Sequence, residues 1–342
     1  MKRLAERGWK FAVRHVLTAW LRLGRATGWL ARRQARIRRR VERAYAAAGA
    51  GTDLPLPAPA PPDWRQLAYA SVSYKPPQFW EQTYIMQDGI PLVQYAGAAE
   101  PRRNYVTAAQ YALSCFDHGR PEAGLALAAW LRQEAEWLPA GGAAYPFGFD
   151  WPMYGLQAPW YSALAQAQVM SVCFRAWSLS SDRSWLEHAE AAGALMIRPA
   201  EAGGLLRHTP EGLVWLEEYP GAQPVLVLNG FVSAVIALLE ARLTGPQPPA
   251  REALAADALR SLKRSFSAYD TGFWLRYDRV SPKHITPEYM KFQALQLDQL
   301  AALTGDPFFP RTAARLRRYY RRRRWLPLYD FDLLKAVTGV RI

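Results

Sequence analysis

Apolar residues recur every three to four positions in eight segments of the chain, which predicts eight amphipathic helices. The expected helices span 106–116, 122–138, 165–179, 185–197, 229–243, 252–266, 289–303 and 309–320. They form pairs around turns near Gly119, Asp182, Gln247 and Gly305, at intervals of 63, 65 and 58 residues. This period fits a repeated helical hairpin followed by a long return. The predicted fold is therefore mainly α, an α/α toroid in the form of an incomplete barrel of about four hairpins.

The returns between hairpins cover residues 140–160, 199–228 and 267–288. They are rich in glycine, proline and aromatic residues and are strand-like. In a stack of hairpins such returns all lie at one end, and sites are commonly built on loops that a rigid scaffold positions. We therefore expect the functional site among these loops.

The first hundred residues have a different pattern. Short alternating runs at 83–87 and 91–95 flank Asp88-Gly89, which predicts a β-hairpin in a small β-rich element over 66–100. Residues 46–65 are an Ala/Pro-rich linker in which a helix cannot continue past Leu54. Residues 1–45 are expected to form a basic amphipathic helical arm, and residues 101–342 the toroid domain.

Within that arm, apolar residues including Trp9, Val13 and Trp20 share one face of a predicted helix over 9–21, with basic residues on its flanks. This pattern is typical of a segment that lies in a membrane interface. A helix docked on the protein's own body and a basic arm in solution are the alternatives.

The net charge of +14 is concentrated in two segments. Residues 1–43 carry a net charge of +12 and residues 311–324 one of +8, which leaves the rest of the chain mildly acidic. We expect residues 1–43 to meet an anionic membrane surface, with an acidic glycan as an alternative. Nucleic acid is not an expected partner, because no recognition motif with interleaved aromatic residues accompanies the arginines.

The chain has only two cysteines, Cys115 and Cys173, and both fall in apolar helical patterns. They are expected to be buried free thiols, and no spacing predicts a metal site. No apolar run is long enough for a transmembrane helix, and charges interrupt the N-terminal segment where a cleaved secretory signal would need an apolar core. A cytoplasmic location, peripheral on the membrane, is expected. The sequence leaves a homodimer open.

The chain contains 14 Trp, 17 Tyr and 13 Phe residues, which serve as core filling or as platforms for sugar rings. Several aromatic motifs follow one another along the predicted helix starts and returns: N-x-V-T-A-A-Q-Y (104–111), P-W-Y-S-A-L-A-Q-A-Q (159–168), E-E-Y-P (217–220), V-L-N-G-F (227–231), Y-D-T-G-F-W-L-R-Y-D (269–278) and K-H-I-T-P-E-Y (283–289). Over about residues 94–303 this series resembles the C-terminal helical domain of the D-glucuronyl C5-epimerases, as a bacterial-type homologue.

The resemblance implies conversion of D-glucuronate to L-iduronate in a uronate-containing saccharide, without a redox cofactor. It implies catalytic roles for Tyr219, Tyr277, Tyr289 and Glu218. Inversion at C5 requires a proton to leave one face of the sugar and another to arrive at the opposite face. The substrate carboxylate also needs cationic or hydrogen-bonding partners.

Ten further residues are expected to bind the substrate: Gln110, Tyr111, Trp160, Tyr161, Gln166, Gln168, Asn229, Arg276, Lys283 and His284. A tyrosine acting as base needs a nearby cation, because its ordinary pKa is about 10. Arg276, Lys283 and His284 are the expected sources of such a charge. Taken singly, Tyr219 and Tyr277 also fit packing roles, and only their occurrence together favours catalysis.

Three other functions remain open at this point. A uronate polysaccharide lyase would use the same carbanion to expel the C4 substituent. A glycoside hydrolase would need two opposed carboxylates, for which Glu217, Glu218, Asp150, Asp270 and Asp278 are candidates. A membrane-peripheral protein that binds a saccharide without turnover is the third.

Overall fold

A computed structural model describes residues 29–57, 83–95, 97–281 and 283–322, and these are mainly helical. The helices of the body are α3 (Tyr105–Asp117), α4 (Pro121–Glu134), α5 (Ala163–Ser180), α6 (Ser184–Gly193), α7 (Leu228–Leu243), α8 (Pro249–Ser265), α9 (Pro287–Thr304) and α10 (Phe308–Arg322). Each of the eight predicted helices has its counterpart, and the mainly α prediction is confirmed.

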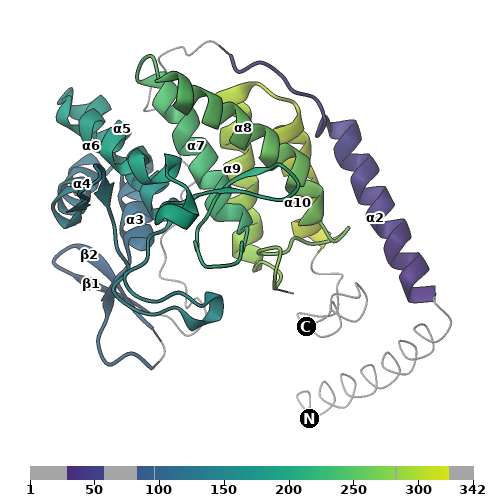
Figure 1. Cartoon of the computed structure of the whole chain (residues 1–342), viewed down its shortest axis with the longest axis horizontal. Coiled ribbons are helices and arrows are strands. Elements are labelled where there is room, and N and C mark those ends of the chain that lie inside the picture. The colour runs from purple at the N-terminus through teal and green to yellow at the C-terminus, as the bar shows by residue number, and fades with distance from the viewer. Residues whose placement is uncertain (1–28, 58–82, 96, 282, 323–342) are drawn as a thin grey trace.

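The helices pack as four hairpins, α3 with α4, α5 with α6, α7 with α8, and α9 with α10. The first helices of successive hairpins also pack side by side in the order α3, α5, α7, α9 (Figure 1). Helix α7 is buried from Leu228 to Arg242 because it has neighbours on most sides. Four hairpins in this order agree with the predicted repeat, while closure into a toroid stays a prediction.

A buried polar network fixes the inner helices against one another. Glu240 of α7 accepts hydrogen bonds from Arg175 (2.9 Å) and Ser171 (2.5 Å) of α5, and from Gln299 (3.1 Å) of α9. Both members of the Arg175–Glu240 ion pair are almost fully buried. Loss of either partner would leave a buried charge, so the network specifies how α5, α7 and α9 align.

The strands are short and are confined to the region before α3 and to the returns. They are β1 (Thr83–Gln87), β2 (Ile90–Gln94), β3 (Arg102–Arg103), β4 (Glu136–Trp137), β5 (Ala143–Ala144), β6 (Leu206–His208) and β7 (Val214–Leu216). The antiparallel β1–β2 hairpin turns at Asp88 and Gly89, which both have positive φ, and this agrees with the predicted hairpin. Strand β3 pairs with β2, β4 with β5, and β6 with β7. Short 3₁₀ turns lie at Pro152–Tyr154, Ala194–Ile197, Ala200–Ala202 and Phe266–Ala268.

Two predicted helix ends were wrong. The helix expected over 122–138 ends at Glu134, because Ala135 is extended and the next two residues pair as β4 with β5. The helix expected over 185–197 is α-helical only to Gly193 and tightens into a 3₁₀ turn over Ala194–Ile197.

Helix α2 (Trp29–Ala48) belongs to the predicted basic arm but packs on the body beside α10 (Figure 1). Val41 and Tyr45 are each only 2% exposed, and the Tyr45 hydroxyl donates to Asp270 at 2.9 Å. Arg315 of α10 binds the same carboxylate at 2.7 Å. The separate arm expected up to residue 45 is therefore, over α2, part of the folded body. The segment predicted for the membrane interface, 9–21, lies outside the described residues.

Cys115 and Cys173 are buried free thiols, as predicted. In the part of the chain that the structure describes, no helix is long and apolar enough to cross a membrane. The described residues also contain no cluster of histidine, cysteine or acidic side chains suited to a metal ion.

Candidate active site

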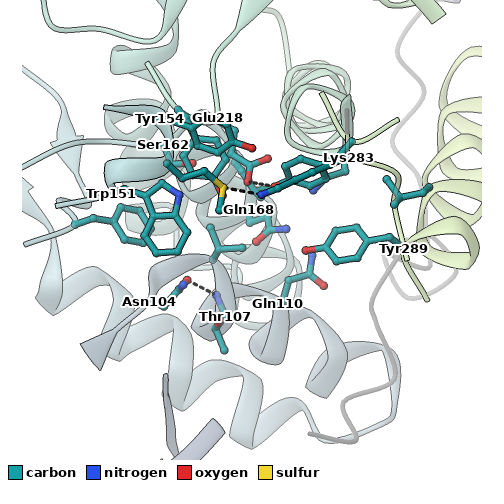
Figure 2. Close-up of a pocket in the computed structure, with 18 of the residues that line it drawn as sticks. Asn104, Thr107, Gln110, Trp151, Tyr154, Ser162, Gln168, Glu218, Lys283 and Tyr289 are labelled. Atoms are coloured by element: carbon teal, nitrogen blue, oxygen red, sulfur yellow. Dashed lines mark hydrogen bonds between the residues drawn. The ribbon is translucent and has the colours of Figure 1, made fainter. Parts of the chain in front are cut away.

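A cavity of about 450 Å³ opens where the inner helices begin and the three returns meet. Its walls come from the N-terminal turns of α3, α5, α7 and α9 and from each return, the loops on which a site was expected (Figure 2). The lining residues used below are Tyr95, Asn104, Gln110, Trp151, Met153, Tyr154, Trp160, Ser162, Gln168, Glu218, Tyr219, Asn229, Tyr277, Lys283, His284, Glu288 and Tyr289.

Glu218 follows strand β7 and is held close against the start of α7. A Cβ atom at Gly230 would lie 2.9 Å from the Glu218 Cβ and would collide with its carboxylate, so glycine at this position makes room for the carboxylate. The backbone N–H of Leu228 donates to the Tyr277 carbonyl at 3.2 Å, which ties the third return to the same helix start. The E-E-Y-P and V-L-N-G-F motifs thus form one unit.

Three tyrosines surround this carboxylate. The Tyr277 hydroxyl donates to Glu218 Oε1 at 3.2 Å. The ring of Tyr289 lies edge-on to that of Tyr277, with centroids 6.1 Å apart, and Tyr219 stacks on Tyr154 at 4.6 Å. Tyr289 enters the cavity from α9, and Glu218 enters it from another wall (Figure 2).

Burial dominates the electrostatics of this group. It raises the pKa of the Glu218 carboxyl to about 7, although hydrogen bonds from Tyr219 and Tyr277 oppose the shift. Burial, followed by the charge of Glu218, raises the pKa of Tyr277, Tyr219 and Tyr289 above the ordinary value of 10. The expectation that a cation lowers a tyrosine pKa was wrong. At neutral pH the three phenols are protonated, and of these four side chains only Glu218 has a pKa near neutrality.

Two neighbouring carboxylates support the site without lining it. Asp278 is buried, accepts from the Tyr154 hydroxyl at 2.9 Å and accepts the backbone N–H of Val280 at 3.0 Å. Glu217 faces Arg207 (3.2 Å) and accepts the N–H of Leu226. Their side chains stabilise the returns rather than pointing at a ligand.

Uncapped helix starts and the donors Gln110 Nε2 and Ser162 Oγ, unpaired within the described structure, make the cavity suited to an anion. Helices α5 and α7 begin without a side-chain cap. In the described part of the chain, buried polar atoms of Gln110, Ser162, Gln168 and Asn229 have no hydrogen-bond partner. Helix N-termini carry partial positive charge and favour carboxylate ligands. Unpaired buried polar groups cost stability unless a ligand satisfies them.

The opening of the cavity is aromatic with one cation. The Lys283 ammonium reaches the Met153 sulfur at 2.7 Å (Figure 2). Trp151 packs edge-on against Tyr95, with centroids 5.8 Å apart. The Trp160 indole is fixed by a 2.7 Å hydrogen bond from Nε1 to the Phe149 carbonyl. Flat aromatic surfaces of this kind suit the apolar faces of sugar rings.

The profile of the family described as "D-glucuronyl C5-epimerase C-terminus" matches residues 141–318, which is more than half of the chain. The chain belongs to this family. It is 30% identical over 173 residues to a D-glucuronyl C5-epimerase of Caenorhabditis elegans, covering 46% of this chain and 28% of that protein. It is 29% identical over 168 residues to an uncharacterized protein of Methanocaldococcus jannaschii, covering 48% of this chain and 53% of the other. The matched part thus spans about half of one relative and less than a third of the other.

Ten of the fourteen residues expected from this epimerase family line the cavity: Gln110, Trp160, Gln168, Glu218, Tyr219, Asn229, Tyr277, Lys283, His284 and Tyr289. Four are not among the lining residues. Gln166 is fully buried, and its side-chain amide hydrogen-bonds to backbone groups of Tyr145, Ala143 and Ala192.

The other three face away for different reasons. Tyr111, on α3, lies beneath the guanidinium of Arg120, whose Cζ is 5.5 Å from the Tyr111 ring centroid. Tyr161 is a half-buried residue beside the cavity wall formed by Trp160 and Ser162. Arg276 pairs as an isolated bridge with His284, and its pKa is lowered by burial and by repulsion from Arg38 of α2, so it lies on the α2 side of the return.

Some lining residues were missed in the sequence. Trp151 and Tyr154 lie in the aromatic-rich return 140–160, and Ser162 lies in the quoted motif 159–168, but aromatic density alone does not distinguish packing from contact with a ligand. Asn104 could have been predicted as the N-cap of α3, because asparagine is a preferred N-cap residue. It accepts the N–H of Thr107 at 3.0 Å, and its amide donates to the Tyr95 hydroxyl. Glu288 lies in the first turn of α9, where acidic residues are common.

Proposed function

We propose that this protein is a uronyl C5-epimerase that inverts C5 of D-glucuronate, to L-iduronate, in a glycan or glycolipid-linked saccharide. The observation that carries the proposal is a buried carboxylate with a pKa of about 7, Glu218, hydrogen-bonded to the phenol of Tyr277. A base whose pKa lies near the working pH combines availability with proton affinity. Family membership supports the same general reaction.

In this mechanism Glu218, with Tyr277 as its hydrogen-bonded relay, removes the C5 proton from one face. Tyr289 donates a proton to the other face, a role that suits a phenol kept protonated by its raised pKa. Since the wall that carries Tyr289 differs from that of Glu218, a pyranose ring between them meets both groups (Figure 2). The reverse reaction uses the same groups in exchanged roles.

The substrate carboxylate gains negative charge in the transition state and must be stabilised. Ser162 Oγ at the start of α5 and Gln110 Nε2 on α3 are buried donors without a hydrogen-bond partner among the described residues, and both line the cavity. Lys283 provides positive charge at the opening. We assign the carboxylate to this side of the cavity, because the uncapped N-termini of α5 and α7 favour an anion there.

The hydrolase alternative is weakened by the contacts of its candidate carboxylates. Asp278 and Glu217 are held within the returns, Asp270 binds Tyr45 and Arg315, and Asp150 accepts the backbone N–H of Ala158. A lyase would form an unsaturated uronate and a non-catalytic binding protein would form no product. The site geometry does not separate these two alternatives from the epimerase.

Incubation with a glucuronate-containing oligosaccharide, followed by NMR of the C5 proton, tests the proposal. We expect iduronate signals with wild-type protein and no unsaturated uronate, which a lyase would form. Tyr277→Phe should lower turnover by about 10²- to 10⁴-fold with little change in affinity. Tyr161→Phe, outside the cavity, is the matched control and should keep nearly full activity. Saccharide binding without any product would favour the non-catalytic alternative.

A further inference from the structure

The basic charge of the described structure is concentrated on two helices that pack together, α2 and α10. Helix α2 carries seven arginines and one acidic residue, and α10 carries six arginines and no acidic residue. Arg36, Arg39, Arg40 and Arg43 of α2 are exposed. Among the described residues none of these four has an ion-pair partner, since the pair on this helix joins Arg38 to Glu42.

On α10 the arginines form a stripe beside the buried face. Arg311, Arg315, Arg318 and Arg322 recur at helical spacing. The first two contact α2: Arg311 donates to the Ala47 carbonyl at 3.4 Å, and Arg315 lies over the Tyr45 ring at 5.6 Å. The first half of the stripe therefore lies where the two helices meet, and the whole stripe spans about 16 Å at 1.5 Å per residue.

Arg318 and Arg322 continue this stripe as exposed side chains. Within the described part of the chain they pair with no carboxylate, in contrast to Arg315 with Asp270 and Arg317 with Asp298. Exposed unpaired arginines of one sign attract an anion at a distance and contribute little to folding.

The C-terminal turns of α10 lie beside the helix that begins at the active-site cavity. Helix α9 begins at the cavity, and α10 runs back along it as the second helix of the hairpin. The Lys291 ammonium lies 5.0 Å from the Tyr320 ring centroid, which places the last turns of α10 beside the first turns of α9. Glu288 and Tyr289, less than one turn before Lys291, line the cavity.

A second connection runs through the third return. His284 lines the cavity, and Arg276 is its bridge partner on the side of α2, close enough to Arg38 for the two charges to repel. The third return thus extends from the cavity wall toward α2, and the Arg276 guanidinium on it lies near the Asp278 carboxylate as well as near Arg38. This accounts for Arg276, which the family resemblance placed in the site but the structure places beside it.

We propose that the α2–α10 arginine seam, Arg311, Arg315, Arg318 and Arg322 with the exposed arginines of α2, binds anionic sugar units that flank the reacting uronate in a polyanionic glycan. The inference rests on the proposed epimerase function for the choice of ligand. It predicts a preference for long anionic chains over short ones, because only a long chain reaches from the cavity to the seam.

The test compares a glucuronate-containing disaccharide with a decasaccharide of the same repeat. For the wild-type protein, KM should fall with chain length at low salt, and the difference should shrink at high salt. The double variant Arg318→Gln, Arg322→Gln should raise KM for the decasaccharide by roughly fivefold, while kcat and the values for the disaccharide stay unchanged. The matched control Arg120→Gln, Arg183→Gln removes two exposed arginines far along the chain from the seam.

Three results would overturn the inference. KM could be independent of chain length, or both double variants could change it equally. The third is loss of binding to phosphatidylserine vesicles in the Arg318, Arg322 variant with KM for the decasaccharide unchanged, which would assign the seam to a membrane surface. If the wild-type protein turns over neither saccharide, the proposed function fails, and retention on immobilised decasaccharide still tests the seam by itself.

Discussion

Glu218→Gln should abolish turnover and at the same time stabilise the fold at alkaline pH. Burial raises the pKa of this carboxyl from 4.5 to about 7, so the folded protein resists ionisation of Glu218. Between these two values the folded state binds more protons than the unfolded state. The contribution of Glu218 to stability is therefore present at low pH and is lost as pH rises through about 7.

The size of the effect follows from the shift. Raising the pH from 5 to 8 should cost the wild-type protein about 2–3 kcal/mol of unfolding free energy through Glu218. Glutamine at this position is never charged and can still accept the Tyr277 hydroxyl hydrogen bond. The variant should therefore become more stable relative to wild type by about 2 kcal/mol over this interval. Glu217, whose pKa is also raised to about 7, is present in both proteins.

Urea unfolding of both proteins at pH 5 and pH 8 measures this difference. Glu187→Gln, at an exposed position, is the control and should change stability by less than about 0.5 kcal/mol at either pH. A Glu218→Gln difference that is the same at both pH values would show that the carboxyl is not titrating in this interval. That result would refute both the raised pKa and the assignment of Glu218 as the base.

Three further outcomes are expected. Gly230→Ala should destabilise the protein by about 2 kcal/mol and reduce turnover at least 100-fold, because the added methyl group displaces Glu218. The control Gly148→Ala, with open space around it, should change neither stability nor turnover, as measured by urea unfolding and turnover assays. Asp270→Asn should cost about 2–4 kcal/mol in urea unfolding by removing the charge that Arg315 and Tyr45 share, whereas Asp298→Asn, in an exposed pair, should cost less than about 1 kcal/mol. The value of kcat should rise with pH through about 7 as Glu218 loses its proton, and a rate independent of pH from 5 to 8 would contradict its role.

The hairpin repeat could be predicted from the sequence because each helix has its own apolar period and its own turn. Where prediction failed, a longer-range contact decided the outcome. The helix expected to reach Leu138 stops early because Glu136 and Trp137 pair with Ala143 and Ala144, a pairing that helical periodicity does not reveal. The sequence of helix α2 suggests a basic arm, because its five large apolar residues, Val41 and Tyr45 among them, are fewer than its seven arginines.

Much of the cavity lining could also be predicted from the sequence, because Glu218, Tyr277 and Tyr289 lie in short motifs that resemble a known family, while their catalytic roles stay a prediction. The direction of the tyrosine pKa shifts could not be predicted from the sequence. A cation beside a tyrosine in the sequence suggested a lowered pKa, but Arg276 points to the α2 side, and burial raises the pKa of Tyr277. Gln166 shows the same limit: its three backbone hydrogen bonds make it structural, although it is two residues from the cavity-lining Gln168.

Hydrogen exchange at C5 of the substrate tests the central claim most directly. A glucuronate-containing oligosaccharide incubated in heavy water with the wild-type protein should acquire deuterium at C5 of both glucuronate and the iduronate formed, as read by NMR and mass spectrometry. Glu218→Gln should leave C5 fully protonated while the saccharide still binds. Absence of deuterium with the wild-type protein, or undiminished exchange in the Glu218→Gln variant, would contradict the account.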